Sequence, residues 1–509
     1  MPPGDFLRRR SRRALRVPLL LVLAGAMAFA LGAVRSEAQP LDLGDENSWI
    51  RIQNVGVRAA TVDLNFYTPD GTMVASDGCP GAGCEALRPG FGRSFFQQGL
   101  SGLNPGYRGS AFVTIDQPFV AMLARDVFRG SQFEIAGDSL RLGGGSSRQF
   151  VPIVQNTNAY VSRLTVQNTS DESDACFQIT YYRQGSLSPV ATDPSGPTAG
   201  CPNGGERVAP RGSMMRDETN LPVPIGFDGA AVVRAFDTGS GVNADAQLPS
   251  VSVDTRSRNG IGLASSRAIG RDELSRVVVL PLVSRNALEN GSTWTTRFRI
   301  LSGDPTAPNA VTLLFEGTDG AGGRIEIEHT VQVLGSLTCD QALNGGGGCL
   351  PPDESLPPTF SGTVRMQSIE PIAVVAQRLA AGGPLADYRG FTAEEASRQV
   401  VLPVVNKNYG PFGGNEGWNS WFSVLTFDGT TAHVRVVYYS KAFPNGLISQ
   451  PVTVDRQRSF RQWEDKNLPD GWVGSAIIVS DRPVVVVANL ESDVFSGDPV
   501  MMYNGVSLE

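Results

Sequence analysis

The sequence predicts an all-β fold, because short apolar strands alternate with frequent turn residues. Apolar residues occupy every second position in several segments, for example Val311, Leu313 and Phe315, and this period is typical of strands with one buried face. The 509 residues include 58 glycines and 34 prolines, which interrupt the chain too often for long helices. A sheet with one apolar face must bury that face against another layer, so we expect two-sheet sandwiches.

One strand-forming element recurs along the chain. It starts with a glycine and small residues and reaches a proline nine residues later, at residues 109–118, 362–371 and 474–483. A looser copy begins at Phe227. Each proline is expected to open a new strand, since its missing N–H is tolerated there. Recurrence at a spacing of about one hundred residues indicates a duplicated domain.

A second recurring element, apolar-Pro-apolar-Val, predicts where each module begins. It occurs at residues 151–154, 280–283 and 402–405. The first module lacks it, because the stretch before Trp49 is acidic and polar. The two elements together predict four tandem β-sandwich modules after a signal peptide. The predicted boundaries are 1–38 for the signal peptide and 39–148, 149–276, 277–399 and 400–509 for modules one to four.

The N-terminus predicts export. An arginine-rich stretch at residues 8–16 precedes an apolar stretch from Val17 to Val34, and Ser36-Glu37-Ala38 then supplies small residues for cleavage. Whether the segment is cleaved or retained is left open, as is the choice between the general and twin-arginine export routes. Later residues include no apolar stretch of spanning length. The mature chain is therefore predicted to lack a membrane span and to be secreted or held at the cell surface.

Charge and composition argue against one class of partner. The chain has 43 Lys and Arg against 50 Asp and Glu, a formal net charge of −7, and loss of the arginine-rich signal peptide would make it more acidic. An acidic protein has no electrostatic reason to bind nucleic acid, so we predict no nucleic-acid partner. The basic residues are almost all arginine, which we interpret as genome composition rather than mechanism.

The six cysteines fall in three close pairs, one in each of the first three modules. In an exported chain, two cysteines per independently folding module favour local disulfides over the other pairings. Cysteine metal sites are disfavoured, because the chain has only two histidines. The predicted pairs are Cys79 with Cys84, Cys176 with Cys201, and Cys339 with Cys349.

No catalytic motif stands out, and we predict neither an enzyme nor a cofactor. His329 and His433 both fall within predicted strands. Gly137-Asp138-Ser139-Leu140 matches the nucleophile block of the GDSL esterases, but the histidine which that family places three residues after an aspartate has no counterpart here. We therefore interpret the block as part of a Gly/Ser-rich linker. Asp-Gly pairs such as 319–320 and 428–429 are interpreted as hairpin turns, with Ca²⁺ binding left open.

Carbohydrate binding is an alternative function. Four of the six tryptophans lie in the last module, and aromatic rings flanked by polar groups can stack on sugar faces. Trp418 and Trp463 are the candidate glycan contacts, whereas Trp49, Trp294 and Trp421 are interpreted as core anchors. A secreted hydrolase with unidentified acids is the second alternative, because a glycosidase needs only two carboxylates.

The combined pattern resembles the tandem, immunoglobulin-like β-sandwich arrays of bacterial cell surfaces. It comprises the signal peptide, the apolar-Pro-apolar-Val module starts, the Gly-small-small strands and the closing Tyr503-Asn504-Gly505. This architectural resemblance covers the mature chain and implies a secreted, non-catalytic structural or adhesive protein. Its partners would be other copies of itself, or extracellular glycans or proteins. The missing first strand would leave an edge open to a strand from another chain, so self-assembly by strand donation is a further hypothesis.

Overall fold

Strands make up nearly all of the regular structure. The computed structural model describes residues 44–508 except 82–83, 141–145, 203, 237, 239–247, 352–353 and 411–416. Within these residues the helices are four short 3-10 turns: η1 (Arg271–Glu273), η2 (Asn344–Gly347), η3 (Ala393–Glu395) and η4 (Gln462–Glu464). The described part contains no helix that is long and apolar enough to cross a membrane. The all-β prediction is confirmed, while the predicted signal peptide 1–38 lies outside the described residues.

The described residues form 35 strands in five sheets. The first are β1 (Asp45–Asn54), β2 (Val62–Tyr67), β3 (Met73–Cys79), β4 (Gly92–Phe96), β5 (Ser110–Ile115), β6 (Phe119–Arg129) and β7 (Gln132–Leu140). Next are β8 (Arg148–Asn156), β9 (Tyr160–Asn168), β10 (Ala175–Arg183), β11 (Pro189–Asp193), β12 (Glu206–Val208), β13 (Ser213–Arg216), β14 (Phe227–Phe236), β15 (Pro249–Ser257), β16 (Leu263–Arg267) and β17 (Ile269–Gly270).

The second half of the chain continues in the same way. Its first strands are β18 (Ser275–Arg285), β19 (Ala287–Glu289), β20 (Ser292–Ser302), β21 (Pro308–Asp319), β22 (Arg324–Leu334), β23 (Ser336–Asp340), β24 (Phe360–Ala380) and β25 (Leu385–Arg389). The last are β26 (Ser397–Lys407), β27 (Trp418–Thr426), β28 (Thr431–Ser440), β29 (Phe443–Ile448), β30 (Val452–Asp455), β31 (Gln457–Arg461), β32 (Trp472–Ser492), β33 (Ser496–Asp498), β34 (Val500–Asn504) and β35 (Val506–Leu508).

Alternating side chains explain why these segments pair into layers. In β21, Val311, Leu313 and Phe315 have no exposed surface, whereas the residues between them are partly exposed. A strand with this alternation turns one apolar face inward. Phe315 packs against Phe298 of β20, with ring centroids 6.3 Å apart. β20 and β21 both pair with β24 in one eight-stranded sheet, so two parts of this sheet bury apolar side chains against each other.

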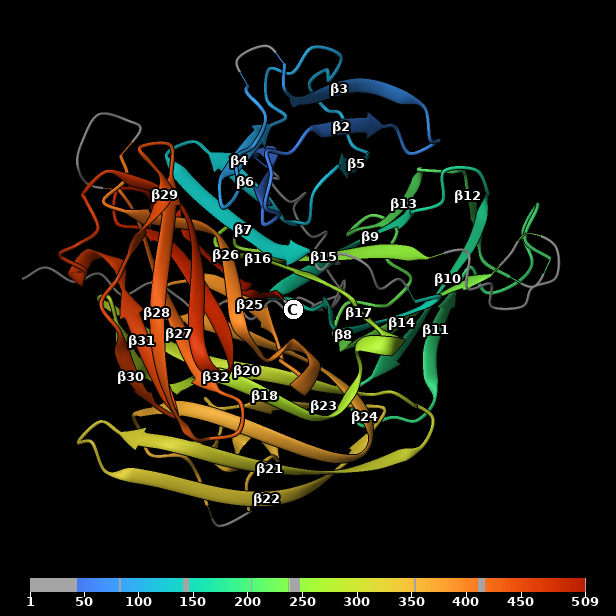
Figure 1. The fold of residues 1–509 in the computed structure, drawn as a ribbon. Helices are drawn as coiled ribbons and strands as arrows, with labels where there is room; N and C mark the ends of the chain where they lie inside the picture. Colours follow the sequence, from blue (N-terminus) through green and yellow to red (C-terminus); the bar gives the residue numbers. More distant parts are fainter. Residues whose placement is uncertain are drawn as a thin grey trace, which may run out of the picture. The chain divides into compact units, whose positions relative to one another are not determined.

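Two strand orders recur along the chain, one of them four times and the other three times in full. One set of four strands, which we call the central group, has the orders β7-β6-β1-β4, β16-β15-β9-β13, β25-β24-β20-β23 and β34-β32-β27-β31. A second set, the lateral group, has the orders β5-β2-β3, β8-β14-β10-β11, β18-β24-β21-β22 and β26-β32-β28-β29. We call a central group and its lateral group a repeat, and Figure 1 shows the strands of all four.

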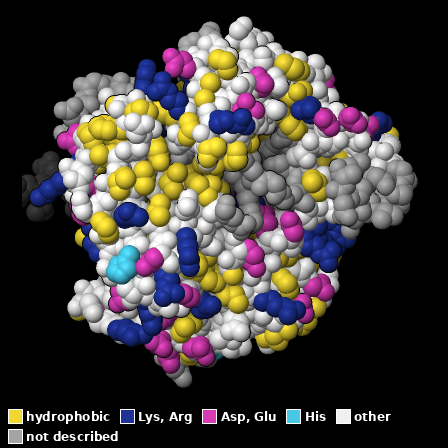
Figure 2. Space-filling model, in the orientation of Figure 1, with side chains coloured by type: hydrophobic (Ala, Val, Ile, Leu, Met, Phe, Trp, Pro, Cys, Tyr) yellow, Lys and Arg dark blue, Asp and Glu magenta, His cyan; other side chains and the backbone are white. Residues whose placement is uncertain are grey.

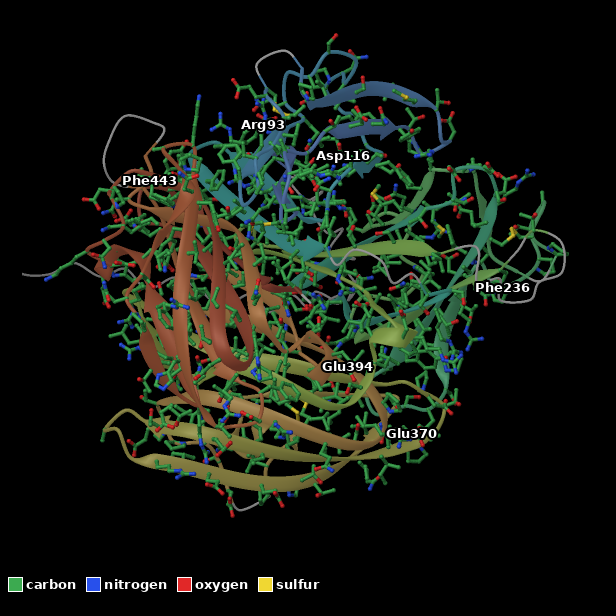
Figure 3. The ribbon with its side chains drawn as sticks, in the orientation of Figure 1. Arg93, Asp116, Phe236, Glu370, Glu394 and Phe443 are labelled. Carbon is green, nitrogen blue, oxygen red and sulfur yellow. A yellow bond between two sulfur atoms is a disulfide. The ribbon has the colours of Figure 1, made fainter. Side chains whose placement is uncertain are left out.

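Two long strands belong to both groups of their repeat. β24 pairs with β21 before Pro371 and with β20 after it, and β32 passes through Pro483 in the same way. Our expectation that these two prolines open new strands is therefore wrong. The strand changes partners at the proline. No ladder hydrogen bond therefore needs the backbone N–H that proline lacks. Beside Pro371, the Asn309 side chain bonds both backbone groups of Glu370, at 2.9 and 3.0 Å; Glu370 is labelled in Figure 3.

One strand from each repeat contacts its counterparts in two other repeats. β7 contacts β16, β16 contacts β25, β25 contacts β34, and β34 contacts β7, so these contacts form a closed ring. Asp498 of β33 accepts hydrogen bonds from the N–H groups of Leu263 and Leu385, at 2.8 and 2.9 Å. Burial raises the pKa of Asp498 well above its usual value. The Asn504 carboxamide bonds both backbone groups of Arg389, at 2.9 Å each. Polar contacts thus hold the ring together.

The apolar clusters also extend across repeats. The cluster of the third repeat includes Val485 and Met502 from the fourth. The cluster of the fourth includes Trp49 and Met122 from the first. The main clusters of the first and second repeats lie within their own segments, whereas those of the third and fourth repeats do not. Leu41–Glu509 accordingly forms one compact unit.

Candidate binding site

A cavity of about 670 Å³ lies between the third and fourth repeats. β18, β19, β21 and β24 supply one wall, and β27, β31 and the turns beside them supply the other. Figure 2 shows charged side chains of both signs over the lower half of the visible face, where Figure 1 places β21, β30 and β31. The charged residues that line the cavity are Arg324, Arg365, Arg456, Arg458, Arg461, Glu289, Glu316 and Asp455.

Three of the five arginines come from one short segment. Arg456 adopts a left-handed backbone conformation with φ 65°, and β31 follows directly with Arg458 and Arg461. Both of these side chains are exposed. The Arg458 guanidinium lies 6.0 Å from the centre of the Phe460 ring, so the aromatic ring between the two arginines also supports one of them. The segment therefore presents basic groups along one wall of the cavity.

The opposite wall supplies two further arginines and a carboxylate. Arg365 of β24 donates to the Phe427 carbonyl at 2.9 Å, and its guanidinium lies 5.4 Å from the centre of that ring. Glu316 of β21 pairs with Arg456 across the cavity and lies 3.8 Å from Arg324. Five arginines thus face three acids in the lining. The cavity is net basic in a chain whose net charge is −7.

Two of the lining residues, Glu289 and Trp421, belong to a buried polar arrangement. Arg378, only 1% exposed, lies 4.9 Å from the Trp294 ring centre and 6.0 Å from that of Trp421. It donates to Glu289 at 2.8 Å. Glu491 accepts from the Trp421 indole N–H at 3.4 Å, and burial raises its pKa to about 7. Glu491 does not line the cavity, and Glu289 is held by its ion pair, so the arrangement supports the wall.

The two tryptophans predicted to contact a glycan lie elsewhere. Trp418 is 9% exposed, and its ring packs 5.6 Å from Phe133 and 5.8 Å from Phe495 between ring centres. Trp463 is partly buried and packs against the apolar cluster of the third repeat. Neither residue lines the cavity. Burial of Trp418 against other rings leaves little of its face for a sugar.

The tryptophans predicted as core anchors are buried. Trp49, Trp294 and Trp421 are 9%, 5% and 6% exposed. Trp421 also lines the cavity, with its indole N–H directed to Glu491. Its role in the core therefore does not exclude a role in shaping the site.

The Gly-Asp-Ser-Leu block is part of β7 and not of a linker, so that prediction is wrong. Ser139 is 1% exposed and donates to the Asn504 carbonyl at 2.6 Å. Asp138 accepts from the Arg267 N–H at 3.0 Å and from Arg389 Nε at 3.3 Å. These long-range partners satisfy the short polar side chains, which explains why a segment of this composition is a strand. The block serves the ring of contacts between repeats.

The predicted Asp-Gly turns hold their carboxylates with local donors. Asp319 accepts from two backbone N–H groups of its own turn, at 2.9 and 2.6 Å. Asp428 accepts from the Thr430 N–H at 3.0 Å and from its hydroxyl at 2.6 Å. Among the described residues, no group of three His, Cys, Asp or Glu side chains could hold a metal ion.

All three predicted disulfides are confirmed. Cys79 bonds Cys84, Cys176 bonds Cys201, and Cys339 bonds Cys349. No free cysteine occurs in the described chain. Disulfides persist in oxidising compartments, so these bonds fit a non-cytoplasmic location.

Sequence reasoning missed the cavity. We interpreted the arginines of the chain as a result of genome composition. However, the segment from Asp455 to Arg461 holds three arginines in seven residues. That density was the available signal. The remaining lining comes from residues 279–365, which are distant in sequence, and from residues 421–429. The sequence matches no protein-family model and no curated protein.

Proposed function

We propose that this chain is an exported, non-catalytic protein of the cell surface or extracellular space, with an adhesive role. In this proposal it consists of four tandem immunoglobulin-like β-sandwich modules, and its predicted signal peptide directs export. The recurring strand order and the three disulfides support this organisation. The proposed target is an anionic glycan, held in the cavity between the third and fourth repeats.

The observation that carries the proposal is the net basic lining of a cavity in an acidic chain. A volume of about 670 Å³ lies within the range of ligand sites. Arg458 and Arg461 are exposed and can bring further donors to a carboxylate or sulfate group, because a guanidinium has five donors.

Carbohydrate recognition by stacking receives less support than recognition by charge. The Trp421 ring lies beside Arg378, and the Phe427 ring lies beside Arg365. Sugar faces would have to compete with these cations for the rings. Acidic polysaccharides, whose carboxylates or sulfates pair with arginine, are therefore the better match.

The test is binding of the purified full-length chain to an array of neutral, uronate-containing and sulfated glycans. We expect binding to anionic glycans that weakens with salt. The double variant Arg458→Ala/Arg461→Ala should bind at least about tenfold more weakly. Arg276→Ala is the control, because Arg276 is an exposed arginine that does not line the cavity.

Three results would overturn the proposal: no glycan binding, equal binding to neutral glycans, or unchanged affinity in the double variant. Incubation of the bound glycan provides a further check. Shortening of the polymer would support the hydrolase alternative, and Glu289→Gln would then identify whether this carboxylate of the lining takes part.

A further inference from the structure

The lateral groups of three repeats share a strand that the first repeat lacks. We call β8, β18 and β26 the lead strands, and each contains the apolar-Pro-apolar-Val element. The lead strands pair with β14, β24 and β32. In the first repeat the counterpart of β14, β24 and β32 is β5, which follows the glycine of the same recurring element, Gly109. Among the described residues β5 pairs with β2 alone and forms the edge of a three-stranded sheet.

The pairing of the lead strands follows one register. The residue before each proline lies opposite the second residue after the glycine, as in Leu402 with Ala476, and the residue two places after the proline lies opposite the glycine itself, as in Val405 with Gly474. The other two lead strands repeat this pattern and the same irregularity at the proline. An incoming strand that kept this register on β5 would place its residue before proline opposite Ala111.

The absence of a lead strand changes the burial of the first repeat's core. Val113 is half-buried on β5, whereas its counterparts Val233, Met366 and Ile478 have no exposed surface. Ala111 and Ile115, on the same side of β5, are also half-buried and pack at the border of the first repeat's apolar cluster. The residues on this side are as apolar as their counterparts. They differ in lacking a neighbouring strand.

The opposite side of β5 is covered at Ser110 and partly at Phe112, whereas Thr114 is exposed. The Arg211 guanidinium lies 4.5 Å from the centre of the Phe112 ring, and the Ser110 hydroxyl donates to the Arg211 carbonyl at 2.5 Å. At the end of the strand, the Asp116 carboxylate accepts from the Thr61 N–H at 2.8 Å; Asp116 is labelled in Figure 3. The strand is therefore fixed in place from β2 and from the second repeat, and its unpaired side is an ordered edge.

Among the described residues, the apolar-Pro-apolar-Val element occurs only in the three lead strands, which are already paired. The predicted signal peptide holds one further uncharged stretch with a proline, Val17–Val34, and its occupation of the edge is an outcome of the test below. Each lead strand contains eight consecutive uncharged residues around its proline, at 149–156, 277–284 and 399–406, and nearly all of them are buried. The eight residues before Gly44, Ser-Glu-Ala-Gln-Pro-Leu-Asp-Leu, include two acids. Burying these unpaired charges would be costly. A second copy has its own lead strands already paired, so it has no spare strand of this kind either.

We propose that the free edge of β5 is a docking site for an extended segment of a different polypeptide. The segment would be about eight residues long, uncharged, and apolar on both sides of a proline, and it would run antiparallel to β5. Addition of a strand to an exposed sheet edge supplies backbone hydrogen bonds for affinity and side-chain burial for specificity. Its binding would complete the lateral group of the first repeat and cover Ala111, Val113 and Ile115.

The experiment uses the purified full-length chain and a synthetic peptide with the sequence of its own lead strand Ser397–Lys407. We expect saturable binding with a dissociation constant on the order of 1 µM. Amide hydrogen exchange in Ser110–Ile115 should slow by on the order of 100-fold when the peptide is bound. The matched control is the same peptide with Leu402→Asp and Val405→Asp, which should neither bind nor protect β5. Val113→Asp in the protein should weaken binding of the unmodified peptide at least about tenfold.

Three outcomes would overturn the proposal. If β5 amides are already as protected as those of β14 in a monomeric protein, residues of the chain itself fill the edge. If protection rises with protein concentration and light scattering detects dimers or larger species, a second copy is the occupant, as in self-assembly by strand donation. If β5 exchanges rapidly and the peptide does not bind, the edge is no docking site. The exchange measurement on the unmodified chain decides these cases even if Val113→Asp fails to fold.

Discussion

β5 and β14 occupy the same place in the first and second repeats, yet their apolar side chains are buried to different extents. Val113 of β5 faces Leu64 on β2, and Val233 of β14 faces Ile179 on β10. β14 also has β8 on its other side, and Val233 has no exposed surface. In the part of the chain that the structure describes, Val113 has no strand on that side, and it is half-buried. Burial in this family of strands is therefore set by the number of neighbouring strands as much as by the residue.

The comparison predicts that the first repeat is deficient only in its lateral group. Its central group is complete and contributes β7 to the ring of contacts. Breaking the ring should thus have the largest effect. Arg389→Ala removes the partner of the buried Asp138 carboxylate and of Glu395, and we expect a loss of about 3–5 kcal/mol in the free energy of unfolding, measured with urea. Arg276→Ala, at an exposed ion pair, should change it by less than about 1 kcal/mol. Equal losses in the two variants would contradict the importance of the ring.

The disulfides allow a second test between the same two repeats. The bond between Cys176 and Cys201 closes a loop with a sequence separation of 25, and the bond between Cys79 and Cys84 one with a separation of 5. Longer loops gain more from closure, so replacing the second-repeat pair with serines should cost about 3 kcal/mol and replacing the first-repeat pair about 2 kcal/mol. Chemical denaturation of both variants measures the difference. A larger loss in the first repeat would indicate that its disulfide compensates for the missing lead strand.

The pH dependence of stability should differ between the central groups of the third and first repeats, because each contains an aspartate whose pKa burial raises to a different value. Burial raises the pKa of Asp387 on β25 to about 7. The folded state therefore keeps a proton that the unfolded state has already released, and stability falls as pH rises from about 5 to about 8, by about 2 kcal/mol. Asp387→Asn should remove most of this fall. Asp126 of β6 in the first repeat has a pKa raised to about 6 by burial, so Asp126→Asn should remove a smaller part at lower pH. Urea unfolding between pH 5 and pH 8 measures both.

The smallest expected effect addresses the comparison directly. Val233→Ala and Val113→Ala make the same change at equivalent positions. Val233 is fully buried, so its truncation should cost about 2 kcal/mol, whereas truncation of half-buried Val113 should cost about 1 kcal/mol. When the lead-strand peptide is bound, the loss of unfolding free energy caused by Val113→Ala should rise towards the loss caused by Val233→Ala. Equal costs without peptide would show that β5 is already covered in solution.

The local sequence pattern predicted the strands, but it did not predict where all of them begin and end. Alternation at Val311, Leu313 and Phe315 predicts a half-buried strand, and the structure has one. The proline rule failed at Pro371, because a strand can continue where it changes partners and the Asn309 side chain bonds the neighbouring residue. The prediction of a linker at Asp138-Ser139 was wrong for a similar reason. The partners of these two residues, Arg389 and Asn504, lie more than 250 residues away in the sequence.

The candidate site was harder to predict than the fold. The arginines at 456, 458 and 461 are visible as a cluster in the sequence, but the cavity exists only because β31 faces residues of β21 and β24. Such a wall depends on packing between repeats, which periodicity within a strand does not report. The disulfides were predictable because each pair is local, with separations of 5, 25 and 10 residues.

The closed order of contacts among β7, β16, β25 and β34 has a consequence for how such a chain can change over time. In an open series, a repeat can be gained or lost at either end, and the new end simply exposes the same surface as the old one. Here β34 of the last repeat already meets β7 of the first. Loss of the third repeat, for example, would leave two unmatched surfaces and would remove Arg389, the buried partner of Asp138 and Asn504. The number of repeats is therefore fixed by the geometry of the ring, and variation should be confined to the loops and to the lateral edges.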